Sequence, residues 1–350
     1  LQMNQVLVIS LLLVLVMGAS FGLNLILLRF LRTMGTKDQK AKIEVRWSAQ
    51  SKPTIGGIGF FFSFLFAVIF GLFINSSIGM PLLFLCAAAM MAFFMGLADD
   101  AFNTRPYFKL FVQITCALLL IAGGFYARLF AAEWMNYLFS LFWIVGMMNS
   151  INMLDNMDGV SGGVSFGIFL GLSAVFIQLN LVFLSLIALC MAAGVLGFLF
   201  LNWKTAKLYM GDSGSQLLGV LLAALACAGP LNIHILDISP FQSLSILVLL
   251  FLLPICDTTL VTINRLRAGQ SPMVGGRDHS THNLSYLGLK DGQIALIYSL
   301  LTLLHSIIIF FLIKSHENYF YLSIVVYEMI VFVTLYAISR KNLKQQRYTY

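Results

Sequence analysis

The stretch VLVISLLLVLVMGASFGLNLILL, residues 6–28, carries no charged side chain and decides the class of fold. An α-helix rises ~1.5 Å per residue, so a run of this length crosses the ~30 Å hydrocarbon core of a membrane. No basic stretch precedes the run and no Ala-x-Ala-like site follows it, which favours a retained span over a cleaved signal peptide. Further apolar runs of similar length follow, and the chain of 350 residues is 60% hydrophobic and only 10% charged.

These runs predict an all-α, polytopic membrane bundle of about eleven transmembrane helices, with a single domain over residues 1–350. The expected spans are 5–29, 55–75, 81–98, 108–126, 134–153, 162–178, 181–202, 214–230, 241–263, 293–313 and 318–338. The connections between them are too short for a separate soluble domain.

Lysine and arginine orient the predicted spans. With the N-terminus outside, all of the 21 Lys and Arg residues except Arg128 and Lys314 fall on cytoplasmic segments. Because cytoplasmic loops are enriched in these residues, we expect an outer N-terminus and a cytoplasmic C-terminus. The inner loops 32–54, 99–107, 154–161, 203–213 and 264–292 would then build the active site.

Two aspartate motifs lie at this inner face. GLADD, residues 96–100, ends the third span with Asp99 and Asp100, and Lys109 opens the next span. MGDSGS, residues 210–215, places Asp212 before the eighth span. Carboxylates cost several kcal/mol in hydrocarbon, so a membrane protein keeps them at the water boundary, against a partner or on a metal. Solvated aspartates and an ordinary helix cap are the structural alternatives.

A third motif, NSINMLDNMDG at residues 149–159, closes the fifth span. Asn149, Asn152, Asp155 and Asp158 repeat every three residues, so on a continuing helix they would form one polar stripe. Buried amides and carboxylates at this density need partners, which a cation and a polar ligand would supply. A purely structural stripe is the alternative.

The longest inner loop contains Arg277, His279 and His282 around a glycine turn, which is typical of an anion-binding lid. Asp257 follows the helix-bending Pro254 by three residues and would face either the site or a polar partner in the bundle. Lys52 begins KPTIGG, residues 52–57, whose glycine pair would allow close helix packing or backbone contact with a ligand.

Together these residues favour a divalent metal and a phosphorylated substrate. Oxygen ligands favour Mg²⁺, or Mn²⁺, over zinc, and the five cysteines all fall within apolar runs, where we expect buried free thiols. A site at the lipid boundary allows one substrate to be a lipid phosphate and the other a soluble nucleotide.

The motifs Gly-x-x-Asp-Asp, Lys-x-x-x-Gln, Asn-x-x-Asn-x-x-Asp-x-x-Asp-Gly, Met-Gly-Asp-Ser-Gly-Ser and Gly-Arg-Asp-His-x-x-His occur here in that order. In this respect the chain resembles the polyprenyl-phosphate N-acetylhexosamine-1-phosphate transferases over nearly its whole length. The resemblance implies transfer of N-acetylhexosamine 1-phosphate, with N-acetylglucosamine the first choice, from a UDP-sugar to undecaprenyl phosphate. UMP would be released and Mg²⁺ required.

The resemblance also implies roles for single residues. Asp212 and Asp100 would bind the metal, and the catalytic group would be Asp99, Asp100, Asp155, Asp158 and His279. The substrate-binding group would be Lys52, Lys109, Asn149, Asn152, Asn202, Asp257, Arg277 and His282. The expected location is the bacterial cytoplasmic membrane, within the lipid bilayer and with the site facing the cytoplasm. No nucleic acid partner is expected, and a homodimer is left open.

Two departures refine this reading. The branch that uses UDP-MurNAc-pentapeptide carries three successive histidines in the late loop, where this chain has His279-Ser280-Thr281-His282. That difference favours the branch that starts O-antigen, common-antigen or teichoic-acid assembly, with the peptidoglycan enzyme as the alternative. Asn283 also stands where many relatives have arginine.

Two other classes fit the sequence less well. A multi-pass transporter would need charges and broken helices at mid-depth in paired halves, and no such repeat is visible. A CDP-alcohol phosphotransferase would need an Asp-Gly-x-x-Ala-Arg string, which residues 158–163 lack.

Overall fold

The computed structural model describes residues 2–33, 52–74, 79–271, 276–313, 315 and 317–347, so most of the predicted inner loop 32–54 lies outside the described residues. The helices in chain order are α1 (Gln2–Thr33), α2 (Gly56–Ile74), α3 (Met80–Phe102), α4 (Pro106–Ala122), α5 (Glu133–Leu154), α6 (Val160–Gln178), α7 (Val182–Asn202), α8 (Gly211–Ala228), α9 (Ile233–Leu236), α10 (Pro240–Leu250), α11 (Leu252–Arg267), α12 (Ser280–Tyr286), α13 (Asp291–Leu312) and α14 (Asn318–Arg347). Within these ranges the chain forms no β-strand, which confirms the all-α prediction.

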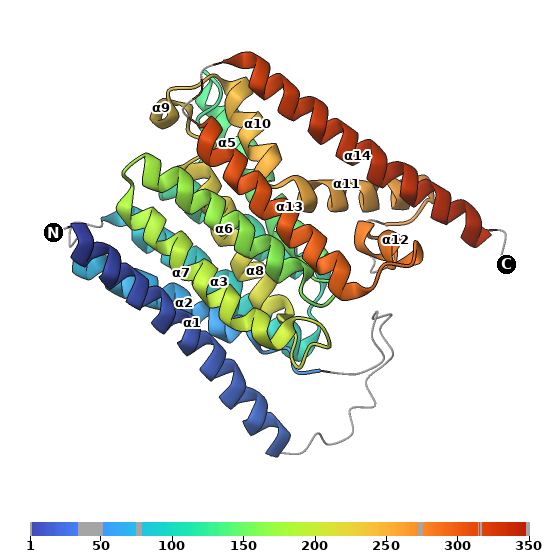
Figure 1. The fold of residues 1–350 in the computed structure, drawn as a ribbon, viewed down its shortest axis with the longest axis horizontal. Helices are drawn as coiled ribbons and strands as arrows, with labels where there is room; N and C mark the ends of the chain where they lie inside the picture. The colour runs from blue at the N-terminus through green and yellow to red at the C-terminus, as the bar shows by residue number, and fades with distance from the viewer. Residues whose placement is uncertain are drawn as a thin grey trace.

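Nine of the described helices are long and apolar enough to cross a membrane, namely α1 to α3, α5 to α8, α13 and α14. The pair α10 and α11 meets the same test when taken together, and α4 is a shorter apolar helix. Each predicted span therefore has a helical counterpart, and the protein is a multi-pass membrane protein (Figure 1).

The predicted ninth span, 241–263, is not one straight helix. It breaks at Phe251, and α10 and α11 meet at an angle of 81°. Pro254 has no backbone N–H for the carbonyl four residues before it, which weakens the helix at this point. As a result α11 packs beside α12 and α14 instead of continuing the line of α10 (Figure 1).

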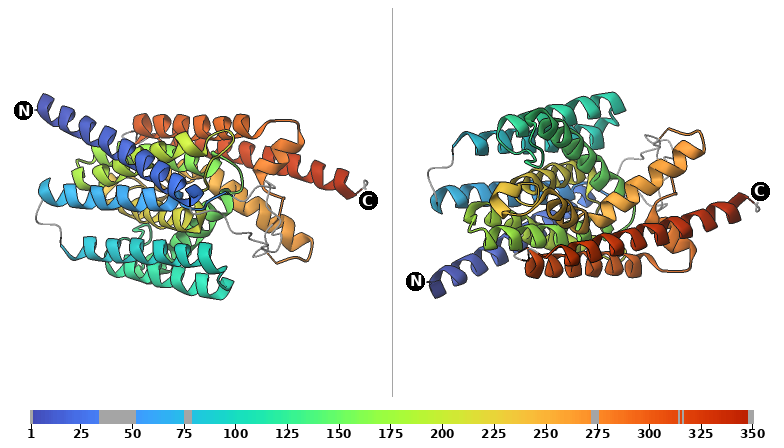
Figure 2. Two further views of the ribbon diagram at one scale, coloured as in Figure 1. Left: turned by 90° about the horizontal axis from the view of Figure 1, so that it is seen from below. Right: turned by 90° about the horizontal axis from the view of Figure 1, so that it is seen from above.

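Helix α8 is the centre of the bundle. It packs against α2, α3, α5 and α6, and 89% of its apolar span is buried. The corresponding fractions for α1 and α14 are 22% and 17%, so these two helices lie at the periphery. Figure 2 shows α3 and α4 on one side of the bundle and α13 and α14 on the other.

Glycines allow two helices to touch the first turn of α8. A Cβ atom at Gly96 of α3 would collide with the backbone of Asp212 and Ser213. A Cβ atom at Gly57 of α2 would lie 2.6 Å from Ser213 Oγ and would collide with the backbone of Gly214. The close packing predicted for the glycine pair is therefore confirmed at Gly57, and small residues are the usual means of such approach in membranes.

The cysteines are free thiols, as expected. Cys116, Cys190, Cys227 and Cys256 are buried, and Cys86 is half-buried.

Candidate active site

The ends of three helices, α3, α4 and α5, meet around the first turn of α8. Asp99 and Asp100 lie in the last turn of α3, Lys109 in the first turn of α4, and Asn152 in the last turn of α5. Hydrogen bonds and ion pairs join all four to the α8 turn that begins at Gly211. The structure therefore brings three separate sequence motifs into one site at the first turn of α8.

Lys109 joins two carboxylates. Its Nζ atom lies 2.6 Å from Asp212 Oδ2 and also forms an ion pair with Asp99 Oδ2. The other oxygen of Asp99 accepts hydrogen bonds from the backbone N–H and the hydroxyl of Thr104, at 2.8 and 2.5 Å. Asp99 of α3 and Asp212 of α8 thus both present oxygens to one cation, the ammonium group of Lys109.

Asp100 has a different role from its neighbour, because it caps α8. Its two oxygens accept the backbone N–H groups of Asp212 at 2.9 Å and Ser213 at 3.0 Å. A carboxylate is favourable here because a helix N-terminus exposes unpaired N–H groups and a partial positive charge. Gly211 has φ +75°, and a Cβ atom there would lie 2.6 Å from Asp100 Oδ2, so this position requires glycine.

The asparagine pair of α5 is tied to neighbouring helices. Asn152 Nδ2 donates to Asp212 Oδ1 at 3.0 Å and to Ser215 Oγ at 2.9 Å. One turn deeper, Gln113 Nε2 donates to Asn149 Oδ1 at 3.2 Å and to Gln216 Oε1 at 3.1 Å. Asn152 therefore lies in the carboxylate cluster, whereas Asn149 belongs to an amide layer beneath it, and its predicted substrate contact stays a prediction.

The predicted polar stripe does not continue past Leu154, where α5 ends with Asp155 as its C-cap. Asp158 instead accepts the backbone N–H of Ala206 at 2.9 Å, and Lys52 Nζ lies 3.6 Å from the same carboxylate oxygen. The expectation of one continuous stripe is corrected in this respect. Asp158 fastens the 203–207 connection to the segment between α5 and α6.

Asn202 braces the same region. Its Oδ1 accepts the backbone N–H of Gly159 at 2.9 Å, and its Nδ2 donates to the carbonyl of Leu208 at 2.9 Å. With 3% of its surface exposed, Asn202 holds two loops together. Its predicted contact with the nucleotide stays a prediction.

A second polar cluster lies where α11, α12 and α13 meet. Buried Asp257 accepts from His279 Nδ1 at 2.8 Å and from Ser280, whose hydroxyl also accepts a bond from Tyr298 at 2.8 Å. Of the two alternatives for Asp257, the structure supports the polar partner within the bundle. Thr281 donates to Asn156 Oδ1 at 2.6 Å, which connects this cluster to the segment after α5.

The late loop is more helical than predicted. Arg265 belongs to the last turn of α11 and forms a two-pronged ion pair with Asp278, at 2.7 and 2.9 Å. Arg277 is exposed beside this pair, and His282 is buried in α12. Residues 272–275, which include part of the predicted glycine turn, lie outside the described part of the chain.

Sequence reasoning missed several residues that hold the site. Thr104 fixes Asp99, Ser215 bonds to Asn152, and Ser280 bonds to Asp257. The only signal for Thr104 was its place directly after the paired-aspartate helix, because Ser and Thr commonly bond to nearby groups at helix ends. Ser280 could not be assigned, since its partner lies in a different helix.

The donor types at the site suit a hard divalent cation. Asp99 and Asp212 offer carboxylate oxygens around one positively charged atom, and neither cysteine nor histidine takes part in that cluster. Asp100, the other predicted metal ligand, differs from Asp99 and Asp212 because both of its oxygens already accept backbone N–H groups. Among the described residues, no group of three or more Asp, Glu, His or Cys side chains is arranged around one point as a metal site.

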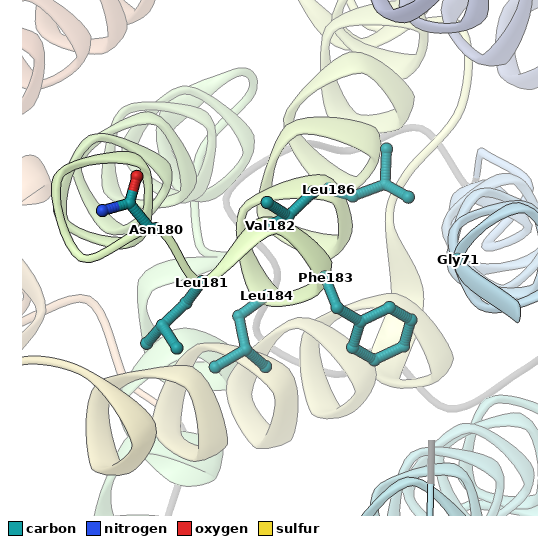
Figure 3. A pocket seen from close by; sticks show the side chains of 7 residues that line it. All are labelled: Gly71, Asn180, Leu181, Val182, Phe183, Leu184 and Leu186. Atoms are coloured by element: carbon teal, nitrogen blue, oxygen red, sulfur yellow. The ribbon is translucent and has the colours of Figure 1, made fainter. Parts of the chain in front are cut away.

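A cavity of about 440 Å³ lies away from this cluster. Its lining comes from Gly71 of α2, from the turn between α6 and α7, and from the start of α7, specifically Asn180, Leu181, Val182, Phe183, Leu184 and Leu186 (Figure 3). Val182 begins α7 and Asn202 ends it, so the cavity and the aspartates lie at opposite ends of that helix. Its lining carries no acid or base, which makes it unsuited to the chemistry of the site.

His282 makes the stability of the protein depend on pH. Burial, together with neighbouring His279, lowers the pKa of His282 from 6.5 to about 4. Between these values the unfolded chain binds a proton that the folded protein does not, so the free energy of unfolding falls as pH decreases. The expected loss at pH 5 relative to pH 7.5 is about 2 kcal/mol. Melting temperatures at both pH values should differ less for His282→Gln, and an unchanged difference would refute this assignment.

Comparison with known proteins finds a family to which the region around this site is similar. The profile of glycosyl transferase family 4 matches residues 82–229, which include the carboxylate cluster. The chain is 28% identical over 288 residues to a probable undecaprenyl-phosphate N-acetylglucosaminyl 1-phosphate transferase of Bacillus subtilis, covering 78% of this chain and 76% of that protein. It is 29% identical over 263 residues to an undecaprenyl-phosphate alpha-N-acetylglucosaminyl 1-phosphate transferase of Yersinia pestis, covering 71% of this chain and 69% of that protein. It is also 28% identical over 317 residues to a phospho-N-acetylmuramoyl-pentapeptide-transferase of Thermotoga petrophila, covering 83% of this chain and 97% of that protein.

The family match and these relatives agree with the motif order and with the membrane bundle. Over residues 82–229 the chain is therefore similar to glycosyl transferase family 4.

Proposed function

We propose that this protein transfers N-acetylglucosamine 1-phosphate from a UDP-sugar to undecaprenyl phosphate, releasing UMP, at the cytoplasmic face of a bacterial membrane. The observation that carries the proposal is the convergence of Asp99, Asp212 and Lys109 at one end of the helical bundle. The names of two relatives support the choice of undecaprenyl phosphate as acceptor and of N-acetylglucosamine 1-phosphate as the transferred group. The distribution of lysine and arginine supports the cytoplasmic side.

The chemistry requires little more than positioning and charge neutralisation. An oxygen of the lipid phosphate attacks the sugar-bearing phosphorus, a new P–O bond forms, and the bond to the UMP oxygen breaks. A phosphate monoester already loses its second proton near pH ~6, so a strong base is unnecessary. Asp99 is therefore proposed mainly as a ligand and positioning group.

The protein's own residues divide this work. Asp212 and Asp99 would hold a Mg²⁺ or Mn²⁺ ion, which when bound would neutralise phosphate charge. Asp100 fixes the first turn of α8 and so places the Asp212 side chain. Lys109 supplies a further positive charge to the phosphates, while Arg277 and His279 would contact the diphosphate or the sugar.

Transfer of phospho-N-acetylmuramoyl-pentapeptide, the reaction of the peptidoglycan branch, is the second candidate, because the Thermotoga petrophila relative is named for that transfer. Ser280 and Thr281 favour the simpler sugar, since their hydroxyls donate to Asp257 and Asn156 where the peptidoglycan branch is expected to carry histidines.

A panel of UDP-sugars separates these candidates. Purified protein with Mg²⁺ and undecaprenyl phosphate is expected to release UMP with UDP-N-acetylglucosamine, and reactions lacking the lipid phosphate are the control. UMP release with UDP-MurNAc-pentapeptide alone would favour the second candidate. No UMP from any sugar would reject both.

A further inference from the structure

The carboxylate of Asp257 lies behind the proposed substrate-contacting histidine. Asp257 follows the bend between α10 and α11 and is completely buried, with 0% of its surface exposed. A buried carboxylate is costly unless both of its oxygens are well bonded. The arrangement around Asp257 meets that condition through residues on two other elements.

Each oxygen of Asp257 has its own partners. Oδ2 lies 2.8 Å from His279 Nδ1, and Oδ1 accepts the backbone N–H and the hydroxyl of Ser280 at 2.7 and 2.5 Å. Tyr298 of α13 donates to the Ser280 hydroxyl at 2.8 Å. Asp257 thus joins α11 to the start of α12 and, through Ser280, to α13.

This bond decides which nitrogen of His279 carries a proton. An ionised carboxylate only accepts hydrogen bonds, so Nδ1 of His279 must donate. Nε2 is then the ring atom left to meet a ligand. A carboxylate bound to one ring nitrogen also fixes the ring orientation, as in metal sites where outer carboxylates orient histidines.

The ring is also fixed relative to the rest of the site. Thr281, two residues after His279, donates to Asn156 Oδ1 at 2.6 Å. Ser150 of α5 donates to the carbonyl of Pro254 at 2.8 Å, which anchors α11 one turn before Asp257. Both bonds connect the Asp257 cluster to the 149–159 motif, so His279 is held at a set position with respect to Asn152.

We propose that Asp257 is a positioning residue for the transfer reaction: it holds the Nδ1 proton of His279 and thereby presents Nε2 to the diphosphate or sugar of the UDP-sugar. This inference rests on the proposed function for its substrate, but the protonation of His279 can be measured without turnover. In this role Asp257 acts through His279, because both of its oxygens are already bonded to His279 and Ser280.

The first test is ¹⁵N NMR of the wild-type protein labelled on histidine, with the His279 signals identified by their loss in His279→Gln. At a pH of about 9, where histidine is normally neutral, we expect the proton of His279 on Nδ1. Asp257→Asn should shift that proton towards Nε2, because an amide can donate to Nδ1. The His305 signals serve as an internal control, since that ring bonds to Tyr327. A neutral wild-type His279 protonated only at Nε2 would overturn the proposal, whether or not the variant folds.

The second test is steady-state kinetics. Asp257→Asn should lower kcat roughly 10–100-fold, with a much smaller change in KM for the UDP-sugar. The double variant Asp257→Asn/His279→Gln should be no slower than His279→Gln alone, because both changes act through one ring. Glu133→Gln makes the same type of carboxylate-to-amide change at the opposite end of α5, and it should leave kcat unchanged.

The outcomes separate this proposal from the proposed function. Additive losses in the double variant, or a normal kcat in Asp257→Asn, would reject the positioning role. If no UDP-sugar is turned over while His279 carries its proton on Nδ1, the proposed function fails and the Asp257–His279 pairing still stands.

Discussion

Asp212→Asn is expected to lower the rate of UMP release at least ~100-fold, a loss of ~3 kcal/mol in transition-state stabilisation. The substitution keeps the size of the side chain but removes the charge that faces Lys109 and the proposed metal. Asn152 can still donate to the remaining amide oxygen, so the local packing should persist. The rate should be measured across a Mg²⁺ titration, in which the variant is expected to need a higher concentration for half-maximal activity.

Asp237→Asn is the matched control, because Asp237 is exposed and lies just after α9, outside the carboxylate cluster. Its turnover should be unchanged. Both variants should elute and melt like the wild type, which separates a loss of chemistry from a loss of fold. Near-normal turnover in Asp212→Asn would show that the metal is held elsewhere.

The sequence predicted the spans because a membrane restricts the chain more strongly than water does. Backbone groups in hydrocarbon must bond within a helix, so an apolar run of sufficient length has few alternatives. The break at Phe251 was only partly predictable. Pro254 indicated a bend, but its size depends on the packing of α11 against α12 and α14.

The site was predictable as a set of motifs but not as a set of contacts. Asp99, Asp100 and Asp212 stood out because charges are rare in this chain. Nothing in the sequence distinguished Asp100, which caps α8, from Asp99, which pairs with Lys109. The two adjacent side chains leave the end of α3 in different directions. Which of them meets α8 can be known only once the position of α8 relative to α3 is known.

The same limit applies to the predicted polar stripe. A three-residue repeat describes one face only while the helix continues, and α5 ends at Leu154. Asp158 consequently faces the 203–207 connection through Ala206, a contact between segments far apart in the sequence.

The second large effect is expected from a single methyl group on α3. Gly96→Ala places a Cβ atom against the backbone of Asp212 and Ser213, which cannot move aside as a flexible side chain would. Helices α3 and α8 must then separate, and overpacking of this kind costs up to about 3 kcal/mol. Because Asp99 and Asp100 follow Gly96 by one turn, the same shift lengthens the bonds from Asp100 to the start of α8. We expect a lower melting temperature and at least a tenfold loss of turnover.

Gly146→Ala tests whether the expected loss comes from the contact or from the substitution. Gly146 lies in α5, and a Cβ atom there would meet nothing within 4 Å. Replacing glycine by alanine inside a helix normally stabilises it by roughly 0.5–1 kcal/mol, so this variant should melt at or above the wild-type temperature with full activity. Equal behaviour of the two variants would contradict the close contact between α3 and α8. A stable but inactive Gly96→Ala protein would instead show that the contact serves the alignment of Asp99 and Asp212 more than the stability of the bundle.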